Sequence, residues 1–311
     1  MTLDSREVEL VKTMGDLVIH YPMFKTALER LVEVFDLSQV SNQSAAMMVL
    51  GESGTGKSTL LKAFMERYPR QITEEKTSIP VLSVEIPSRP TIKSTADAIL
   101  TQFDRLYVGG SAGEKTKRIK LLIKQCEVRV IVFDEFQHFI DRGTTTANTA
   151  VADWIKGLMN ETKVSVVIFG LPRAARILRY NDQLRRRFSA AIKMRPWVFE
   201  SSEDIREFKG IIKALERATN LPAPGELHTE DMMRRLFFAS GGLIGYLAKL
   251  VTMSACTAMK NGDGRITIAH LHSTFIKHIW AEATSNRNPF NESFEWRPLN
   301  RANEPFEPVL I

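Results

Sequence analysis

Residues Met47 to Leu61 read MMVLGESGTGKSTLL, and this stretch decides the fold of the chain. An apolar run leads into a segment that matches G-x-x-x-x-G-K-[ST] at every fixed position, and a helix-like segment extends from Thr59 to Tyr68. A strand, a glycine-rich turn and a helix in this order let successive backbone N–H groups point at one anion. The stretch therefore predicts a binding loop for the phosphates of a nucleoside triphosphate. A chance connection between a strand and a helix is the disfavoured alternative.

The side chains of this loop have separate expected roles. Lys57 would reach the terminal phosphates of ATP, and the Ser58 hydroxyl would supply an oxygen ligand to Mg²⁺. The other residues expected to surround the phosphates are Gly51, Ser53, Gly54, Thr55, Gly56 and Thr59.

The composition bounds the class of protein. The chain has 311 residues, of which 44% are hydrophobic, so it can bury the core of one large domain or of two ordinary ones. Cys126 and Cys256 lie far apart without metal-ligand spacing, which argues against a disulfide framework or a zinc site and favours a reducing cytoplasm. We expect no export signal and no membrane span, because the longest apolar runs are as short as Val164 to Leu171. The net charge of +6 favours a polyanionic partner without proving one.

A second chemical signal is the apolar strand Val130 to Phe133, which ends in Asp134 and Glu135. Open parallel sheets place ligands beyond the carboxyl ends of their strands. Asp134 is therefore expected to hold Mg²⁺ through water, and Glu135 is expected to orient and deprotonate the attacking water. Acids also follow strands as simple turn residues, but the phosphate loop earlier in the chain favours the catalytic interpretation.

Buried strands alternate with helices up to about residue 200, which predicts a parallel sheet with crossover helices. The fold class is therefore α/β: a central five-stranded parallel sheet flanked by helices, followed by a small all-helical domain. The predicted strands are Met47–Leu50, Pro80–Ile86, Arg129–Phe133, Val164–Gly170 and Met194–Phe199. The predicted helices are Lys25–Phe35, Thr59–Tyr68, a segment capped by Thr91 or Ser94 that ends near Tyr107, Glu114–Cys126, Val151–Thr162, Ile205–Thr219, Thr229–Ser240, Tyr246–Asn261 and Ile268–Thr284. The domains are expected at 1–45 (an N-terminal helical segment), 46–199 (the α/β core), 200–284 (the helical domain) and 285–311 (an extended tail).

A concentrated arginine triplet, Arg185 to Arg187, follows the fourth predicted strand. A planar and permanently charged guanidinium group can stabilise the charge that develops on the γ-phosphate of a neighbouring subunit. We expect an arginine finger here, with Arg187 ahead of Arg186. The alternative is a basic helix end at the surface.

Three other features of the sequence can each be interpreted in two ways. Tyr21 and Phe24 precede the first strand, where P-loop proteins often wall the nucleotide base, and ordinary core packing is the alternative. The basic segment Lys115 to Lys124 is either a solvated helix face or a phosphate-facing patch. The spaced aromatics of the tail dock either on a partner or on the chain itself. These aromatics are Phe290, Phe294, Trp296 and Phe306.

With these motifs in this order, the chain resembles an AAA+ ATPase. More closely, it resembles the TniB/TnsC family, the ATPase regulators of transposons that use a DDE transposase, including CRISPR-associated ones. The segments that carry the resemblance are His20–Phe24, Gly51–Thr59, Val132–His138, Phe169–Pro172, Leu184–Phe188 and Ser240–Gly245.

The chain departs from the wider AAA+ pattern in two places. Phe169–Pro172 lacks the polar residue that commonly senses the γ-phosphate, so Arg173 or Arg176 would have to substitute for it. The segment Gly241–Tyr246 lacks the arginine that many relatives place there. Both departures are compatible with slow hydrolysis.

The resemblance implies an ATP-hydrolysing protein that assembles into rings or helical filaments around double-stranded DNA in the cytoplasm. It implies that the filament links a TniQ-like target selector to the transposase, and that hydrolysis disassembles the filament. A helicase loader or initiator-like ATPase would share every chemical residue. A nucleotide-gated scaffold that binds no DNA is a further alternative, in which the positive charge is merely solvated.

Subunits stacked around a duplex need basic side chains that contact phosphates without reading bases. The loops after the second strand and after the acidic strand lie at the ligand edge of the predicted sheet. Lys93, Arg142 and Thr145 of these loops are the expected DNA contacts, and the segment Lys115 to Lys124 is the second choice.

Overall fold

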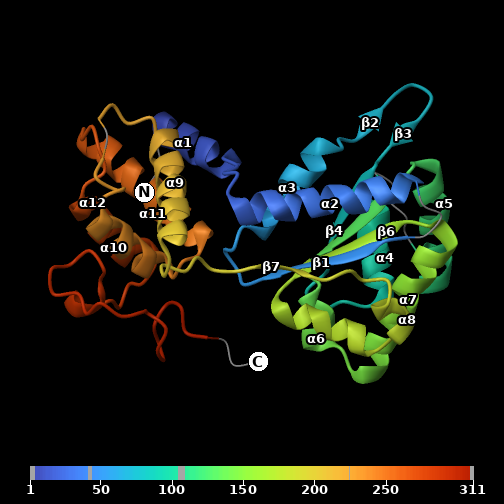
Figure 1. Cartoon of the computed structure of the whole chain (residues 1–311). Coiled ribbons are helices and arrows are strands. Elements are labelled where there is room, and N and C mark those ends of the chain that lie inside the picture. Colours follow the sequence, from blue (N-terminus) through green and yellow to red (C-terminus); the bar gives the residue numbers. More distant parts are fainter. Residues whose placement is uncertain (1–3, 41–43, 104–108, 224, 309–311) are drawn as a thin grey trace. The chain divides into compact units, whose positions relative to one another are not determined.

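The computed structural model of the chain describes residues 4–40, 44–103, 109–223 and 225–308, which fall into two compact units (Figure 1). The sheet unit comprises Pro22–Ser53 and Lys57–Met194, and the helical unit comprises Met1–Tyr21, Gly54–Gly56 and Arg195–Ile311.

The sheet unit contains a five-stranded parallel sheet, as predicted, and the order of its strands in the sheet is β4-β5-β6-β1-β7. Val49 at its centre lies opposite Phe169 on one side and Ile192 on the other. The strands are β4 (Val81–Glu85), β5 (Val130–Asp134), β6 (Ser165–Gly170), β1 (Ala46–Gly51) and β7 (Ile192–Met194). A short antiparallel hairpin, β2 (Gln71–Ile72) with β3 (Thr77–Ser78), was not predicted.

Helices cover both faces of this sheet, which is why its central strands read as continuous apolar runs. Every residue of β1 and β6 is buried, and successive side chains alternate between the two faces. On one face, Met48 and Ile131 share a core with α4, α5 and α7. On the other face, α2 packs on β1, β5 and β6, and α3 packs on β1 (Figure 1). The helices of the sheet unit are α2 (Pro22–Val40), α3 (Lys57–Arg67), α4 (Ile92–Thr101), α5 (Ala112–Gln125), α6 (Gln137–Arg142), α7 (Thr145–Thr162), the 3₁₀ helix η1 (Pro172–Arg179) and α8 (Asp182–Arg185).

The helical unit is built around α11, which contacts α1, α9, α10 and α12. Leu250, Val251 and Ala255 of α11 are fully buried among these helices. Within the described residues, no single helix is both long and apolar enough to cross a membrane; α10 and α11 meet that criterion only together, and the chain bends by 114° between them. The helices of this unit are α1 (Ser5–Asp16), α9 (Ser202–Ala218), α10 (Glu230–Ser240), α11 (Ile244–Asn261), α12 (Ile268–His278) and the 3₁₀ turn η2 (Ser285–Arg287).

The fifth strand differs from its prediction. It is Ile192–Met194 rather than Met194–Phe199. Pro196 has no N–H to donate to a strand ladder. Beyond it, the Trp197 N–H donates to the Gly242 carbonyl over 2.7 Å, so this stretch packs within the helical unit.

Several helix ends are also corrected or completed by the structure. Thr91, not Ser94, is the N-cap of α4, and the Ser94 hydroxyl accepts from the Thr91 N–H in return. This helix ends at Thr101, and its predicted end near Tyr107 lies outside the described residues. The last predicted helix ends at His278 instead of Thr284, because the N–H groups after it turn back onto the Phe275 carbonyl.

The predicted N-terminal segment 1–45 does not form one unit. Helix α1 packs with the helical unit, where Lys260 pairs with the buried Glu7 over 3.0 Å. Helix α2 packs on the sheet, where Phe24 and Leu31 are fully buried. The two helices therefore separate at Tyr21 and Pro22.

The C-terminal tail is folded rather than extended over residues 285–308. Phe290, Phe294 and Leu299 are buried, and Phe306 packs edge-to-face on Tyr246 with ring centroids 5.3 Å apart. Arg287 is 6% exposed and donates to Glu304 over 3.0 Å. The aromatics of the tail thus dock on the chain itself, which was one of the two interpretations of the sequence.

The packing of the tail should depend on pH through Glu304, whose side chain is only 7% exposed. Burial alone raises the pKa of a carboxyl group, but hydrogen bonds from Arg297, the Arg301 N–H and Arg287 bring that of Glu304 down to about 2. Because this value lies below the unfolded pKa of about 4.3, the stabilisation is complete above that pH and is lost as the pH falls toward 2.

Glu304→Gln should therefore lower the free energy of unfolding by about 1.5–3 kcal/mol at pH 7, the range for hydrogen bonds to charged groups. Denaturant titrations of the variant and the parent at pH 7 and pH 3 measure this effect. Glu292→Gln is the matched control, because Glu292 lies on the exposed surface of the same tail. If Glu304→Gln lowered the free energy of unfolding by the same amount at pH 7 and at pH 3, the stabilising role of the ionised Glu304 carboxylate would be contradicted.

Candidate nucleotide site

The phosphate-binding loop connects the end of β1 at Gly51 to the start of α3 at Lys57. Gly54 and Gly56 have φ values of 81° and 92°, in the left-handed region that side chains rarely adopt. The first four N–H groups of α3 have no partner within the helix. The loop therefore offers a cradle of N–H donors at a helix start, which is suited to an anion.

Lys57 is a buried cation at this loop. Its side chain is 8% exposed, and Nζ donates to the carbonyls of Gly51 over 2.8 Å and of Glu52 over 3.0 Å. Burial lowers the pKa of the Lys57 ammonium group. The charges of three nearby carboxylates, Glu135, Asp134 and Glu52, only partly offset this effect. A negatively charged ligand would therefore be favoured beside Lys57.

The two predicted acids lie at the end of β5, at the carboxyl edge of the sheet. Burial raises the pKa of the Asp134 carboxyl group, although its Oδ1 accepts a hydrogen bond from the Glu135 N–H over 2.8 Å. Glu135 has a φ of 53°, which is uncommon for a residue other than glycine. The structure thus brings Lys57, Asp134 and Glu135 within electrostatic range of one another.

These residues fit a nucleotide with a divalent cation. The buried Lys57 and the half-buried Asp134 both have their charged forms disfavoured by burial, and phosphates together with a cation would relieve both. Ser58 is exposed at the start of α3, where its hydroxyl can join Asp134 as a ligand. In the part of the chain that the structure describes, no group of three or more His, Cys, Asp or Glu side chains could hold a metal ion.

Of the two aromatics before the first strand, Tyr21 lies beside the phosphate-binding loop. A Cβ atom placed on Gly56 would be 3.5 Å from the Tyr21 hydroxyl oxygen. The Tyr21 ring packs edge-to-face on Trp197 at 4.7 Å, and burial raises its pKa to about 12. Phe24 is buried in α2, as core packing requires.

The start of α11 contacts the same loop within the helical unit. The Gly245 N–H donates to the Gly54 carbonyl over 2.9 Å. A Cβ on Gly245 would meet the Gly54 Cα at 3.1 Å, and a Cβ on Gly54 would meet the Tyr246 ring at 3.5 Å. The segment Gly241–Tyr246, which lacks an arginine, thus contacts the phosphate-binding loop through its backbone. A contact of this kind cannot be predicted from the side chains of the segment.

Of the two arginines considered as substitutes for a polar sensor, Arg173 lies near the acids and Arg176 is exposed. Arg173 forms a two-pronged ion pair with Asp141, with Nε–Oδ1 at 2.5 Å and Nη2–Oδ2 at 2.8 Å. This hydrogen bonding raises the pKa of Arg173, and the charges of Glu52 and Glu135 contribute to the same effect.

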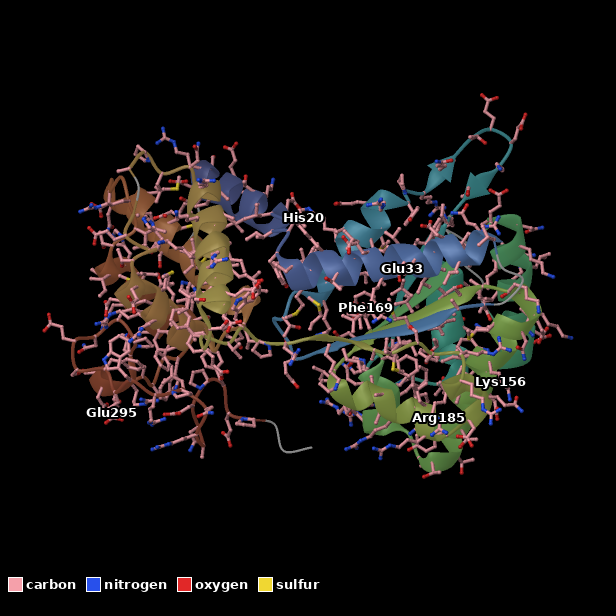
Figure 2. All side chains as sticks on the ribbon, in the orientation of Figure 1. His20, Glu33, Lys156, Phe169, Arg185 and Glu295 are labelled. Atoms are coloured by element: carbon pink, nitrogen blue, oxygen red, sulfur yellow. The ribbon has the colours of Figure 1, made fainter. Side chains whose placement is uncertain are left out.

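The three arginines of the triplet have different surroundings. Arg187 is held in its own sheet unit, where it donates to Ser44 Oγ over 2.8 Å and to Asn160 Oδ1 over 2.5 Å. Arg185, which is labelled in Figure 2, is exposed at the end of α8 and pairs with Asp182 at 3.2 Å. Arg186 is exposed, and no side-chain hydrogen bond or ion pair of Arg186 is found among the described residues.

The candidate DNA contacts Lys93, Arg142 and Thr145 are all exposed. Lys93 lies in the first turn of α4, Arg142 ends α6, and Thr145 begins α7, so all three follow strands at the carboxyl edge of the sheet. His138 of α6 contacts the Ile86 carbonyl through Nδ1 at 3.0 Å, which ties the two loops together.

The basic helix α5 is partly neutralised. Lys115 is buried and pairs with Asp97, and Lys120 pairs with Glu161 at 2.6 Å. Lys124 stays exposed. Lys117 is exposed as well, so α5 stays the second choice for the DNA surface.

Gln137 is a site residue that sequence reasoning missed. It is 3% exposed, and its Nε2 donates to Glu135 Oε2 over 2.5 Å. Its Oε1 accepts from the Leu171 N–H over 3.0 Å, at the end of β6. The only sequence signal is its position two residues after Glu135.

The strand order, the phosphate-binding loop between β1 and α3, the acids at the end of β5 and the helical region that follows define the class of protein: this is an AAA+ ATPase fold. Residues 11–198 match the family model described as "Bacterial TniB protein", and the chain belongs to the TniB family. The predicted fold class and family are thereby confirmed.

Solved structures share this fold at low sequence identity. Cdc6p from Pyrobaculum aerophilum has a TM-score of 0.61 and 16% identity, with 83% of this chain and 67% of that chain covered. The Aeropyrum pernix ORC1 protein in complex with DNA has a TM-score of 0.56 and 16% identity, covering 88% and 69%. Domain III of the Thermotoga maritima replication initiation protein DnaA has a TM-score of 0.51 and 14% identity, covering 88% and 97%. No curated protein matches the sequence.

Proposed function

We propose that this protein is an ATP-hydrolysing regulator of DNA transposition that assembles on double-stranded DNA in the cytoplasm. The observation that carries the proposal is the meeting of Lys57, Asp134 and Glu135 at the end of β5, because P-loop ATPases bind phosphates and position water with this set of groups. The family match supports the role in transposition. The Aeropyrum ORC1 and Drosophila ORC structures, both bound to DNA, support DNA binding by this fold.

The residues of the site divide the reaction between them. The loop N–H groups and Lys57 bind the phosphates of ATP, with Tyr21 beside the loop. Glu135 accepts a proton from the water that attacks the γ-phosphate. The Ser58 hydroxyl, and Asp134 through water, would hold Mg²⁺, which would supply positive charge beside the phosphate oxygens.

Arg186 is the better candidate for a finger that reaches a neighbouring subunit. Its exposed guanidinium group is available to a neighbour, whereas Arg187 is engaged with Ser44 and Asn160 of its own sheet unit. The proposal thus moves the finger by one residue from the sequence-based choice. A finger that acts between subunits requires a ring or a helical filament.

The proposed assembly connects two kinds of partner. Rings or filaments with ATP on DNA would link a TniQ-like target selector to the transposase, and hydrolysis would disassemble them. A helicase loader would use the same site, and the fold likeness to Cdc6p does not separate the two at 16% identity. Retention of a transposase, and not of a replicative helicase, on the immobilised protein with ATP and DNA would distinguish them.

Assembly can be measured by negative-stain electron microscopy with a DNA duplex and a non-hydrolysable ATP analogue. Rings or filaments should appear on DNA only with nucleotide. Lys57→Ala should abolish ATP binding and assembly, because it removes the buried cation at the phosphates. Lys25→Ala is the matched control, since Lys25 is exposed on α2 of the same unit.

Glu135→Gln should keep ATP binding, slow hydrolysis by roughly 10²–10⁴-fold, and leave assemblies that persist. Chelation of Mg²⁺ should stop hydrolysis by the parent protein. Dispersed particles beside bare DNA with and without nucleotide would favour the scaffold that binds no DNA. A Glu135→Gln variant that hydrolyses ATP at the normal rate would remove Glu135 from its role.

The DNA contacts can be tested by the salt dependence of binding. Each phosphate contact contributes about 0.9 to the slope of log affinity against log salt concentration. Lys93→Ala and Arg142→Ala should each lower the slope by about that amount, and Thr145→Ala should weaken binding without changing the slope. Lys124→Ala on α5 should leave the slope unchanged, and a change confined to that variant would move the DNA surface to α5.

The finger can be tested by mixing subunits. Arg186→Ala should bind ATP normally and lose about 10³-fold or more in hydrolysis. Glu135→Gln subunits, which assemble and keep Arg186, should restore activity when they are mixed with Arg186→Ala subunits. Arg187→Ala should mainly destabilise the sheet unit, by about 1–3 kcal/mol for the Ser44 and Asn160 bonds. Rescue of a folded Arg187→Ala variant in the same mixture, without rescue of Arg186→Ala, would return the finger to Arg187.

A further inference from the structure

The carboxylate of Glu135 is held by one buried side chain, that of Gln137. Glu135 itself sits at a left-handed φ of 53°, directly after the last residue of β5. A backbone conformation of this kind persists only where the surroundings enforce it. The Gln137 amide lies at the start of α6 and donates to Glu135 Oε2 over 2.5 Å.

The orientation of the Gln137 amide follows from its second partner. The Leu171 N–H lies 3.0 Å from Gln137 Oε1, and a backbone N–H can only donate. The amide oxygen must therefore face Leu171, which leaves the NH₂ group to face Glu135. With both ends engaged and 3% exposure, this side chain has a single favourable orientation.

The Gln137 amide oxygen lies close against the last residue of β6. A Cβ on Gly170, the last residue of β6, would lie 2.7 Å from Gln137 Oε1. The Phe136 N–H also donates to the Phe169 carbonyl over 3.1 Å, so the chain after β5 is joined to the end of β6 by backbone and side chain together. Phe169–Pro172 is the segment in which the sequence offers no polar sensor.

We propose that Gln137 is a positioning residue for hydrolysis: it aims the Glu135 carboxylate at the attacking water and couples it to the end of β6. This inference rests on the proposed role of Glu135 as the base. The segment Phe169–Pro172 has no polar side chain that could contact the site. Gln137, which follows β5, provides a polar side chain there through its hydrogen bonds to Glu135 and to the Leu171 N–H. Because catalysis falls steeply when a reacting group is misplaced by about 1 Å, loss of this hydrogen bond should lower kcat by roughly 10²-fold.

Two variants separate positioning from mere structural support. Gln137→Glu keeps an oxygen that accepts from Leu171 but loses the donor to Glu135, whereas Gln137→Leu loses both bonds. Both variants should bind a fluorescent ATP analogue with parental affinity and should show kcat lowered by roughly 10²-fold with KM within about two-fold. Gln71→Glu, an exposed glutamine of the β2–β3 hairpin, controls for the added charge and should leave kcat unchanged.

The split between kcat and KM gives a signature that structural support alone would not produce. Loss of positioning lowers kcat while KM and the affinity for the ATP analogue stay at the parental values. A variant whose site has collapsed would instead show a raised KM and weaker analogue binding together with the lower kcat.

The outcomes distinguish this inference from the proposed function. A parent protein that does not hydrolyse ATP, or a fully active Glu135→Gln, would overturn the proposed function itself. An active parent with an inactive Glu135→Gln, but with parental kcat in Gln137→Glu, would overturn only the role of Gln137. A higher kcat in either Gln137 variant would also overturn it, because the amide would then restrain Glu135 rather than aim it.

Discussion

The site depends on opposite charges that meet at one edge of a sheet whose central strands are almost entirely apolar. The strands β1 and β6 are buried along their length and β5 is buried up to Asp134, so the charged side chains lie at the carboxyl ends of these strands. Lys57 and Asp134 meet there, and burial disfavours the charged form of each. A site with this arrangement is completed by an anion and a cation together, which is what a nucleotide and Mg²⁺ provide.

The groups around this edge are held by short, directional contacts rather than by apolar packing. Gln137 holds Glu135 and the end of β6, and Asp141 holds Arg173 through two hydrogen bonds. Charge-assisted bonds of this kind fix orientation as well as distance. The side chains of Glu135 and Arg173 are thereby fixed in place before any ligand binds. Such preorganisation suits a reaction that relies on positioning and on electrostatic stabilisation.

Features of this protein differ in how far the sequence predicts them, according to their physical origin. The phosphate-binding loop and the acids at the end of β5 were predictable, because glycine conformation, helix starts and strand ends impose residue types at fixed spacing. The packed tail and the division of residues 1–45 were not predictable, because they depend on which distant surfaces bury the tail aromatics and α1. The early end of the fifth strand was predictable from Pro196. Proline has no backbone N–H to donate to the neighbouring strand, so a strand is not expected to continue through it.

The sequence by itself determined the fold class, the order of its strands and helices, and the residue types at the phosphate loop, because these follow from local periodicity and from backbone constraints. The tertiary structure alone decided which side chains are engaged and which are available. It tied Arg187 to Ser44 and Asn160 and left Arg186 exposed, and it placed Gln137 between Glu135 and Leu171. The physical reason is that a hydrogen bond joins groups by distance in space, and residues as far apart as Ser44 and Arg187 become neighbours only when the sheet has formed.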